Sequence, residues 1–477
     1  MNTLNIGLQW NELDEQLVEA ITGNADKVWE YAEVGFEEFK SSNTLVEWIE
    51  SEGFEITERN IAGIDTSWVA SFGSGSPVIG ILTEYDALPD LGNEAVPSET
   101  PRKDGTTSGH GCGHNLIGTG AIGGAVALKR RMEKAGITGT LRVYGCPAEE
   151  LLAGKNYMAK AGVFDDLDAC LHWHPMNMNT TFNIATVASA DLKVEWHGKN
   201  AHAGGAPWEG RSALHASELF THGINTMREH IVPEARMHYY VENGGSAVNV
   251  IPDKSSIVFR YRGPNAADVQ KNLDWIRDIA KGAALMTQTK VDITEMAACY
   301  DVLPNQVLSD RVYSHLEQFQ VPEWTEEEQA FARNLQREAG YPEDGMATDM
   351  TADFRGASMG GSTDVGDISY ITPTMGVLVA AWPLHVQPHH WGATASNGMS
   401  LGHKAAVKAA QVLAATGLDL LTDPDLLEAA TEEFKQRTGG KPYKSMCTAE
   451  AHPIIRQRHA QAGDGSCGCI ADILGKG

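Results

Sequence analysis

The sequence is poor in cysteine and lacks long apolar runs. Its seven cysteines among 477 residues are few, odd in number and irregularly spaced, so we expect no disulfide framework and a reducing, cytoplasmic location. Apolar stretches such as 121–128 are interrupted by glycine and fall far short of the roughly 20 residues that cross a bilayer. Positions 5–10 carry no basic, signal-like start. We therefore expect neither a transmembrane segment nor a signal peptide.

Basic residues are also scarce, 37 against 63 acidic ones, which gives a formal net charge of -26. Such a surface repels nucleic acid and anionic membranes, and we expect neither as a partner. An anionic small molecule is not excluded, because a few local donors can still converge on it. The length predicts about two to three domains, and the 42% apolar content predicts a sizeable core.

Strand and helix patterns alternate along the chain and predict an α/β fold, with a mixed sheet flanked by helices. We expect helices within 12–60, strands at 67–72 and 78–82, a glycine-rich helix at 114–135 packed closely on the sheet, and buried strands at 140–145 and 168–173. Beyond residue 300 we expect an acidic helix at 326–338, a loop-rich stretch to about 400, a helix at 402–416 and a polar tail.

The order of predicted strands and helices is different in residues 188–300. The pattern reads strand, helix, strand, strand, helix, strand, at 192–197, 213–230, 236–242, 256–262, 266–286 and 290–296. This βαββαβ order is that of ferredoxin-like folds. We predict that residues 188–300 form a compact domain inserted into a larger one, which comprises 1–187 and 301–477.

Candidate metal ligands occur in four clusters. Cys112 and His114 stand two residues apart in GHGCGHN (109–115), and a thiolate and an imidazole on such a turn can face one zinc-like ion. Glu149 and Glu150 follow a predicted strand, where one could bind a metal and the other accept a proton. His174 ends another strand. The fourth cluster contains His385, His389 and His390.

Each cluster has an alternative reading without a metal. The Cys–His turn could be loop packing, the glutamate pair a solvated acidic loop, and the strand histidine a core residue. Several clusters nevertheless fall where predicted strands end, and open α/β sheets bind ligands at the carboxyl ends of their strands. Their joint occurrence favours one shared site.

These segments resemble the co-catalytic metallopeptidase family, which contains carboxypeptidase G-type enzymes, hippurate hydrolases and auxin-conjugate amidohydrolases. The motifs that carry the resemblance are EYDALP (84–89), HGCGHN (110–115), EE (149–150), HP (174–175) and a late histidine. The chain is most similar to the branch of aminobenzoyl-glutamate hydrolase B subunits, through VFDD (163–166), AALMT (283–287) and GSTDVGD (361–367). Asn115 and Glu84 stand where hippurate hydrolases have aspartate, and both match that branch. The resemblance covers nearly the whole chain.

The resemblance implies a centre of two divalent ions, bridged by Cys112. It implies His114, Glu150, His174 and His389 as the other ligands, Glu149 as general base and Asp86 as a residue that orients a ligand. His389, rather than its two neighbours, follows from its spacing to His403. Cysteine and three histidines favour zinc, whereas a carboxylate and an open site admit manganese or cobalt.

The inserted domain then acts as a lid and dimerisation domain. The resemblance implies that His202 reaches into the active site of the partner subunit and stabilises the oxyanion. Asn249 corresponds to a substrate-binding asparagine. Arg262 is a candidate for the substrate carboxylate, with a surface ion pair as its alternative role. Cys447, Cys467 and Cys469 have no assigned role.

The implied function is hydrolysis of the amide bond of an N-acyl amino acid, with p-aminobenzoyl-glutamate as first choice. A dipeptide or an auxin- or hippurate-type conjugate is the alternative substrate. A non-catalytic partner subunit is the alternative of another class, although Glu149 and a complete ligand set speak against an inactive chain. We expect a homodimer through the inserted domain, or a hetero-oligomer with a homologous subunit.

Overall fold

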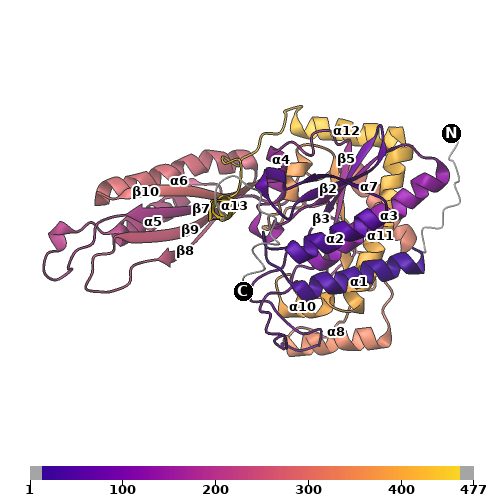
Figure 1. Ribbon diagram of the computed structural model, residues 1–477, viewed down its shortest axis with the longest axis horizontal. Coiled ribbons are helices and arrows are strands. Elements are labelled where there is room, and N and C mark those ends of the chain that lie inside the picture. Colours follow the sequence, from indigo (N-terminus) through magenta and orange to yellow (C-terminus); the bar gives the residue numbers. More distant parts are fainter. Residues whose placement is uncertain (1–12, 462–477) are drawn as a thin grey trace. The chain divides into compact units, whose positions relative to one another are not determined.

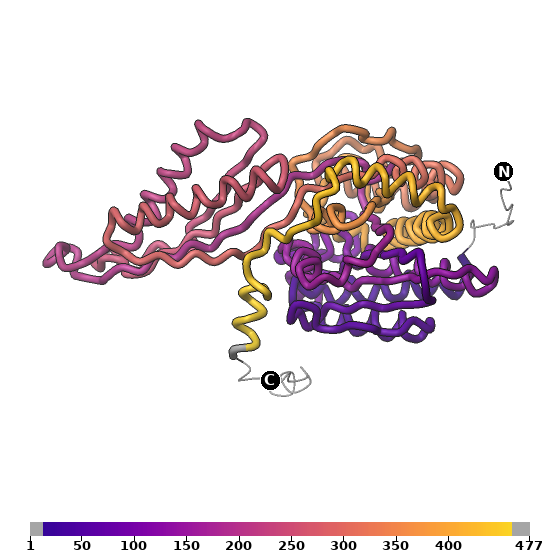
Figure 2. The backbone as a smooth tube through the Cα atoms, turned by 90° about the horizontal axis from the view of Figure 1, so that it is seen from above, coloured from indigo at the N-terminus to yellow at the C-terminus, as the bar shows by residue number. Residues whose placement is uncertain are grey.

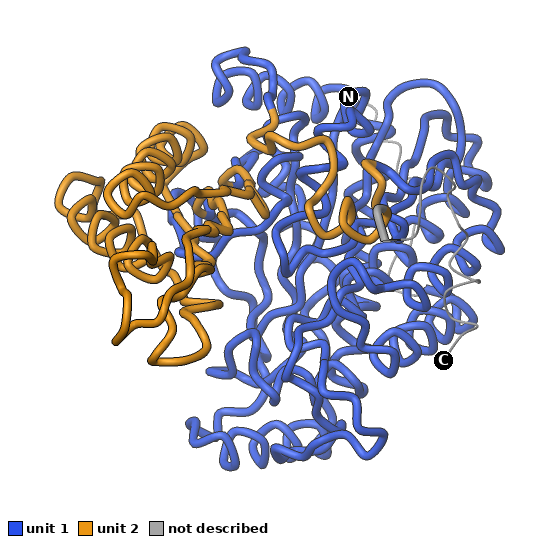
Figure 3. Tube along the Cα trace, turned by 60° about the vertical axis from the view of Figure 1, so that its left-hand side comes forward, with its two compact units in different colours: residues 1–61, 65–186, 302–444 blue, residues 62–64, 187–301, 445–477 orange. Residues whose placement is uncertain are grey.

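The structure, a computed structural model, describes residues 13–461 and divides into two compact units. Unit 1 comprises residues 1–61, 65–186 and 302–444, and unit 2 comprises 62–64, 187–301 and 445–477 (Figure 3). Cys467, Cys469 and positions 5–10 lie outside the described residues.

The division differs from the predicted domains in the C-terminal tail. The inserted segment runs over 187–301, against a predicted 188–300, but the described residues 445–461 cluster with unit 2. Cys447 Sγ lies 3.5 Å from Ala298 O, and Thr448 N donates to Glu295 Oε1 at 2.7 Å. These bonds join the segment to a strand of unit 2, a long-range pairing that local sequence patterns do not reveal.

A seven-stranded mixed sheet forms the centre of unit 1, as predicted. Its order is β1-β2-β4-β3-β5-β11-β6, and Figure 1 labels β2, β3 and β5 of this sheet. The strands are β1 (Glu55–Arg59), β2 (Trp68–Ser74), β3 (Val78–Thr83), β4 (Gly139–Gly145), β5 (Ala169–Met176), β6 (Thr180–Thr181) and β11 (Thr374–Ala380). Strands β4, β3, β5 and β11 run parallel. Their carboxyl ends therefore lie along one edge of the sheet.

Helices complete unit 1. They are α1 (Glu15–Tyr31), α2 (Phe39–Ser51), α3 (His114–Ala135), α4 (Lys155–Lys160), α7 (Gln306–Phe319), α8 (Glu326–Glu338), α9 (Val365–Ser369), α10 (Trp391–Asn397), α11 (Ser400–Thr422) and α12 (Pro424–Thr438). The predicted bounds of α3 and α8 agree with the structure. Strand β11, helix α7 and helix α12 were not predicted. All seven residues of β11 are buried, and so short an apolar run has no periodicity that separates it from loop or helix.

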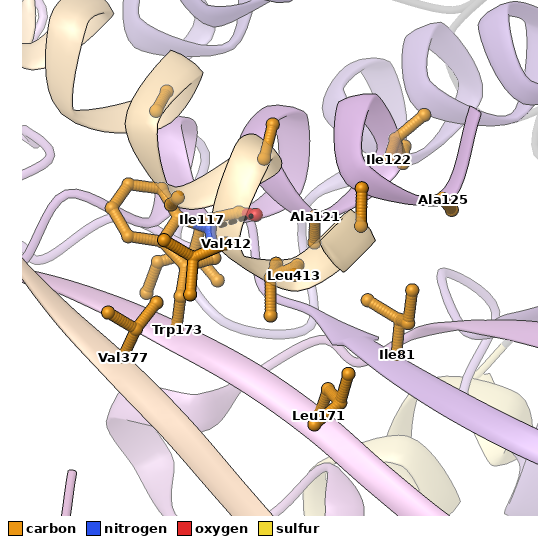
Figure 4. Packing of buried hydrophobic residues seen from close by; sticks show 14 of the residues in the cluster. Ile81, Ile117, Ala121, Ile122, Ala125, Leu171, Trp173, Val377, Val412 and Leu413 are labelled. Carbon is orange, nitrogen blue, oxygen red and sulfur yellow. Dashed lines mark hydrogen bonds between the residues drawn. The ribbon is translucent and has the colours of Figure 1, made fainter. Parts of the chain in front are cut away.

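Helices α3 and α11 pack together on the sheet, and Figure 4 shows the apolar side chains between them and strands β3, β5 and β11. Trp173 Nε1 donates to Ile117 O at 3.0 Å. A Cβ added to Gly120 would lie 3.0 Å from Ala406 O, so this glycine permits the close approach of the two helices.

In the described part of the chain α11 alone is long and apolar enough to cross a membrane, but 72% of the apolar stretch that meets this test is buried. It is therefore read as a core helix.

Unit 2 has the predicted ferredoxin-like architecture. Its elements are β7 (Ala188–His197), α5 (Ala213–Met227), β8 (Arg236–Asn243), β9 (Lys254–Gly263), α6 (Ala266–Thr287), β10 (Lys290–Cys299) and α13 (Pro453–Gln461). The antiparallel strand order is β10-β7-β9-β8, and Figure 2 shows α5 and α6 along one side of the strands. Phe220 packs against Trp196 and Phe259, at 5.3 and 5.9 Å between ring centroids. This face forms the core of the unit, and β8 is left as an edge strand.

Candidate metal centre

The predicted ligands of unit 1 meet at the carboxyl edge of its parallel strands. His174 lies within β5, and Glu149 and Glu150 follow β4 in a short helical turn, η2 (Glu149–Leu151). Cys112 and His114 lie at the N-terminus of α3, and His389 lies between β11 and α10. Segments distant in the sequence thus converge on one place, as the positions of the strand ends indicate.

A left-handed glycine sets the turn that holds Cys112 and His114. Gly113 precedes α3 with φ 78°. A Cβ there would lie 2.5 Å from Pro175 Cγ, so both the conformation and the space require glycine. The turn places Cys112 Sγ 3.3 Å from His174 Nε2. The thiol and two imidazoles are thereby gathered around one point.

Asp86 orients two of the candidate ligands. Its Oδ1 lies 2.9 Å from His114 Nδ1, and its Oδ2 accepts a hydrogen bond from Glu150 N at 2.9 Å. The second ring nitrogen of His114, Nε2, therefore points away from Asp86. This atom is buried and has no hydrogen-bond partner in the structure. A buried imidazole nitrogen of this kind needs a partner, and a metal ion meets that need.

Three carboxylates surround His114 Nε2 without bonding to it. Their oxygens lie 3.5 Å away for Glu84 and 3.8 Å away for each of Glu149 and Glu150. These distances exceed those of hydrogen bonds. Glu150 Oε1 is likewise buried without a partner. The donors thus surround a common centre at which a cation would satisfy them all.

The late histidine cluster contributes one side chain, that of His389, to the candidate metal site. His389 Nε2 lies 3.3 Å from Glu150 Oε2, and His389 N donates to Gly111 O at 2.9 Å. His385 Nε2 instead pairs with Asp344 at 2.7 Å, and His390 Nδ1 accepts from Gly392 N at the start of α10. The structure therefore places His389, rather than its two neighbours, beside the other candidates.

Among residues 13–461 there are three groups whose ligand atoms lie, within each group, no more than 4.8 Å apart: Cys112, His114 and His174; Cys112, Glu150 and His389; and Glu84, His114 and Glu149. Cys112 joins the group that contains His174 to the group that contains His389, which is the arrangement of a bridging ligand, and His114 also belongs to two groups. Thiolate, imidazole and carboxylate donors are those that zinc and similar divalent ions prefer. The residues present fit two ions.

The negative charge of the site also favours the binding of cations. Five carboxylates stand against a single ammonium, that of Lys155: Glu84, Asp86, Glu149, Glu150 and Asp364. Buried charges without compensation are strongly unfavourable. Burial, followed by Glu150, raises the pKa of the Cys112 thiol far above its usual range. The thiolate therefore depends on a bound cation, which would displace the proton.

Glu149 has the environment of a proton acceptor. Burial, followed by the charges of Glu84 and Asp364, raises the pKa of Glu149 well above its ordinary value. A carboxylate with a raised pKa takes up a proton more readily near neutral pH. The distances to His114 Nε2 are 3.8 Å for Glu149 and for Glu150, so the distance to His114 does not separate base from ligand.

Sequence reasoning gave no role to a buried network beside the site. Lys155 Nζ lies 2.6 Å from Glu84 Oε1 and 2.5 Å from Asp364 Oδ1. Asp364 Oδ2 also accepts from Gly154 N and Lys155 N, at 3.1 and 2.7 Å. Burial raises the pKa of Glu84, but Lys155 and then His114 more than offset this and hold the pKa below its usual value. The sequence signals were the motifs 84–89 and 361–367, which contain Glu84 and Asp364.

Glu38 supports the loop that carries the glutamate pair. Its Oε1 accepts from Phe36 N at 2.9 Å and Ala148 N at 2.8 Å, and its Oε2 accepts from Thr66 Oγ1 at 3.0 Å. Burial, followed by the charge of Asp86, raises the pKa of Glu38 to about 8. The side chain is therefore a neutral acid at neutral pH.

Replacing Glu38 by glutamine should make the protein more stable at alkaline pH. The folded pKa lies above the ordinary value of 4.5, so this group's contribution to stability is complete below that value and is lost as the pH rises to about 8. Glutamine keeps an acceptor for both backbone N–H groups and cannot ionise. Melting curves should show an advantage of Glu38→Gln that widens from about pH 5 to about pH 8. Parallel curves for the variant and the wild type would contradict this.

In unit 2 the structure brings His202 and Asn249 together. Two loops pair there, because His202 and Val250 form an antiparallel bridge and Ala203 N donates to Asn249 O at 2.9 Å. His202 Nδ1 accepts from Gly204 N and from a second glycine N–H, that of Gly205, at 3.1 and 3.0 Å. The proton of the neutral ring therefore resides on Nε2. His202 is exposed and presents Nε2 as a donor.

Arg262 is not part of this loop pair. It is paired in register with Ser189 and Arg236, whereas Lys254, which adjoins the loops, is at the other end of β9. Eight residues of strand separate the two ends, roughly 26 Å. Within unit 2, Arg262 therefore does not act at the same point as His202 and Asn249.

Comparison with known proteins agrees with this picture. A family profile described as "Peptidase dimerisation domain" (M20_dimer) matches residues 184–286. The chain is 38% identical to the B subunit of p-aminobenzoyl-glutamate hydrolase from Escherichia coli (strain K12), over 88% of this chain and 93% of that protein. It is 28% identical to the Xaa-Arg dipeptidase of Mus musculus, over 88% and 90%. The crystal structure of an aminobenzoyl-glutamate utilization protein from Klebsiella pneumoniae has a similar fold, with a TM-score of 0.57 at 18% identity over 84% of this chain and 98% of that one.

Proposed function

This chain belongs to the M20 peptidase family, and we propose that it hydrolyses the amide bond of an N-acyl amino acid with two divalent ions bound between Cys112, His114, Glu150, His174 and His389. The predicted family is confirmed, and the chain is a metal-dependent hydrolase of that family. The main observation behind the proposal is that Cys112 belongs to two groups of candidate ligand atoms.

The chain's own groups supply the proton transfers. When bound, the two ions would polarise the scissile carbonyl and make water a stronger acid. Glu149 accepts a proton from the attacking water and returns it to the leaving amine, a role that its raised pKa supports. Asp86 holds His114 and the Glu150 backbone in place. His202 donates from Nε2 to the oxyanion that develops on the substrate.

The substrate that we propose first is p-aminobenzoyl-glutamate or a similar conjugate. The support is the 38% identity to a protein named as its hydrolase. A dipeptide is the second candidate, because a relative of 28% identity is named as a dipeptidase. Hippurate- and auxin-type conjugates follow. Turnover of a panel of these amides by the purified chain, with and without added divalent ions, tests the proposal, and loss of all activity only after chelation would support it.

The same assay tests the alternative that the chain is a non-catalytic partner subunit. The Escherichia coli relative is named as one of the subunits of a hydrolase, so a homologous second chain is a proposed partner. Activity of the chain alone would exclude the non-catalytic role. Activity that arises only when a homologous chain is added would favour it. We also propose a cytoplasmic location, supported by the few and irregularly spaced cysteines of the sequence.

We further propose that each active site is completed by the partner subunit's His202. The matched dimerisation profile supports pairing through unit 2, and β8 offers an unpaired strand edge. Mixing inactive His202→Ala and Glu149→Gln proteins should restore part of the activity after subunit exchange, because each mixed dimer would contain one intact site. Light scattering should give a dimer or larger. Demonstrated exchange without activity would contradict donation between subunits.

A further inference from the structure

We propose that Glu84 is itself a ligand of the ion beside His114, a sixth protein ligand beyond the five that the resemblance implies. This inference rests on the proposed two-ion centre and deepens it. Glu84 follows β3 directly and is buried. Its Oε2 lies 3.5 Å from His114 Nε2, closer than the nearest oxygen of either Glu149 or Glu150.

The geometry around His114 favours direct binding. Glu84, His114 and Glu149 each offer one ligand atom, and these atoms lie within 4.8 Å of one another. Because His114 Nε2 is buried and has no hydrogen-bond partner, the 3.5 Å approach of Glu84 Oε2 leaves this nitrogen unsatisfied. An ion placed between His114 Nε2 and Glu84 Oε2 binds both, with Glu149 beside it as the proton acceptor.

Lys155 and Asp364 explain how Glu84 is held. Lys155 Nζ binds Glu84 Oε1 at 2.6 Å and Asp364 Oδ1 at 2.5 Å, and all of these side chains are buried. With Oε1 fixed by the ammonium, Oε2 is left to face His114. The arrangement directs a single oxygen of Glu84 at the ion.

Glu84 is more than a counter-ion for Lys155. Asp364 already provides one negative charge, and it is fixed by Lys155 Nζ and by the backbone N–H groups of Gly154 and Lys155. Two carboxylates therefore share one ammonium in a buried place. The surplus negative charge is unfavourable unless another cation lies next to it. That cation is the ion bound by His114 and Glu84.

A glutamate ligand changes which metal ions this position prefers. Oxygen donors suit manganese and magnesium better than thiolates do, whereas cysteine favours zinc. With Glu84 as a ligand, the ion beside His114 gains an oxygen donor that the group of Cys112, His114 and His174 lacks. We expect manganese to compete with zinc more successfully at the Glu84 position.

The test is metal affinity measured without turnover. Wild type, Glu84→Gln and Glu84→Asp are dialysed against buffered free zinc or manganese and analysed for ions per chain, and bound manganese is followed by electron paramagnetic resonance. Glutamine removes the charge, and aspartate keeps it but withdraws the carboxylate by one methylene. Both variants should bind one of the two ions at least about 10-fold more weakly, a loss no smaller than that of an outer-shell partner. The manganese signal should weaken most.

Glu328→Gln is the matched control, because Glu328 is a buried carboxylate bonded to Lys404 and Ser400 outside the site. It should bind two ions like the wild type. Unchanged metal affinity in both Glu84 variants, with a lower melting temperature for Glu84→Gln, would reduce Glu84 to a counter-ion and overturn the inference. Failure of the wild type to bind any ion would instead overturn the proposed function.

Discussion

The Glu149→Gln protein should turn over substrate about 10²–10⁴-fold more slowly than the wild type, the range that general acid–base groups contribute. Glutamine has nearly the same size and can still accept a hydrogen bond, but it cannot take a proton from water. Metal content should remain near that of the wild type, because the five implied ligands are unchanged. Metal analysis and kcat measured on the same preparation check both statements.

The comparison with Glu150→Gln separates the two glutamates. Glu150 lies 3.3 Å from His389 and forms a ligand group with it and Cys112, so its variant should lose metal as well as turnover. If only the Glu149 variant lost metal, Glu149 would be the metal ligand and Glu150 the proton acceptor. Glu133→Gln, an exposed carboxylate paired with Lys129, should behave as wild type in both assays.

Most of the architecture could be predicted from the sequence because its elements are long and strongly patterned. Helix α3 and the ferredoxin-like order of unit 2 show clear periodicity and chain order. Strand β11 escaped prediction because all of its residues are buried and all but Thr374 lack a polar side chain, so no alternation of polar and apolar residues marks its two faces. This strand lies next to β5, so its omission left the sheet incomplete on the side of His174 and His389.

The site could be predicted in part for a similar reason. Motifs next to strand ends marked Cys112, His114 and the glutamate pair. The role of Lys155 could not be inferred, because its partners Glu84 and Asp364 come from segments 71 residues before and 209 residues after it, and only folding brings them together. Isolated charges in a sequence usually belong to the solvated surface. Burial, which makes these charges important, is a property of the packed structure.

The Cys112→Ala protein should lose metal from both positions and show no measurable turnover. Cys112 belongs to one ligand group with His114 and His174 and to another with Glu150 and His389, so its removal takes a donor from each ion. His389→Ala removes a donor from a single group and should weaken the binding of one ion only. Metal analysis of both variants against a series of free-metal concentrations distinguishes the two patterns.

Cys170→Ala provides the control, because Cys170 is a buried thiol in β5 that belongs to none of these groups. It should retain about two ions per chain and its activity. Chelation should inactivate the wild type and the Cys170 variant alike, and added divalent ions should restore both, whereas the Cys112 variant should stay inactive. Full occupancy of both positions in Cys112→Ala would show that Cys112 does not bridge the two ions, because the loss of a thiolate that holds both ions would weaken the binding of both.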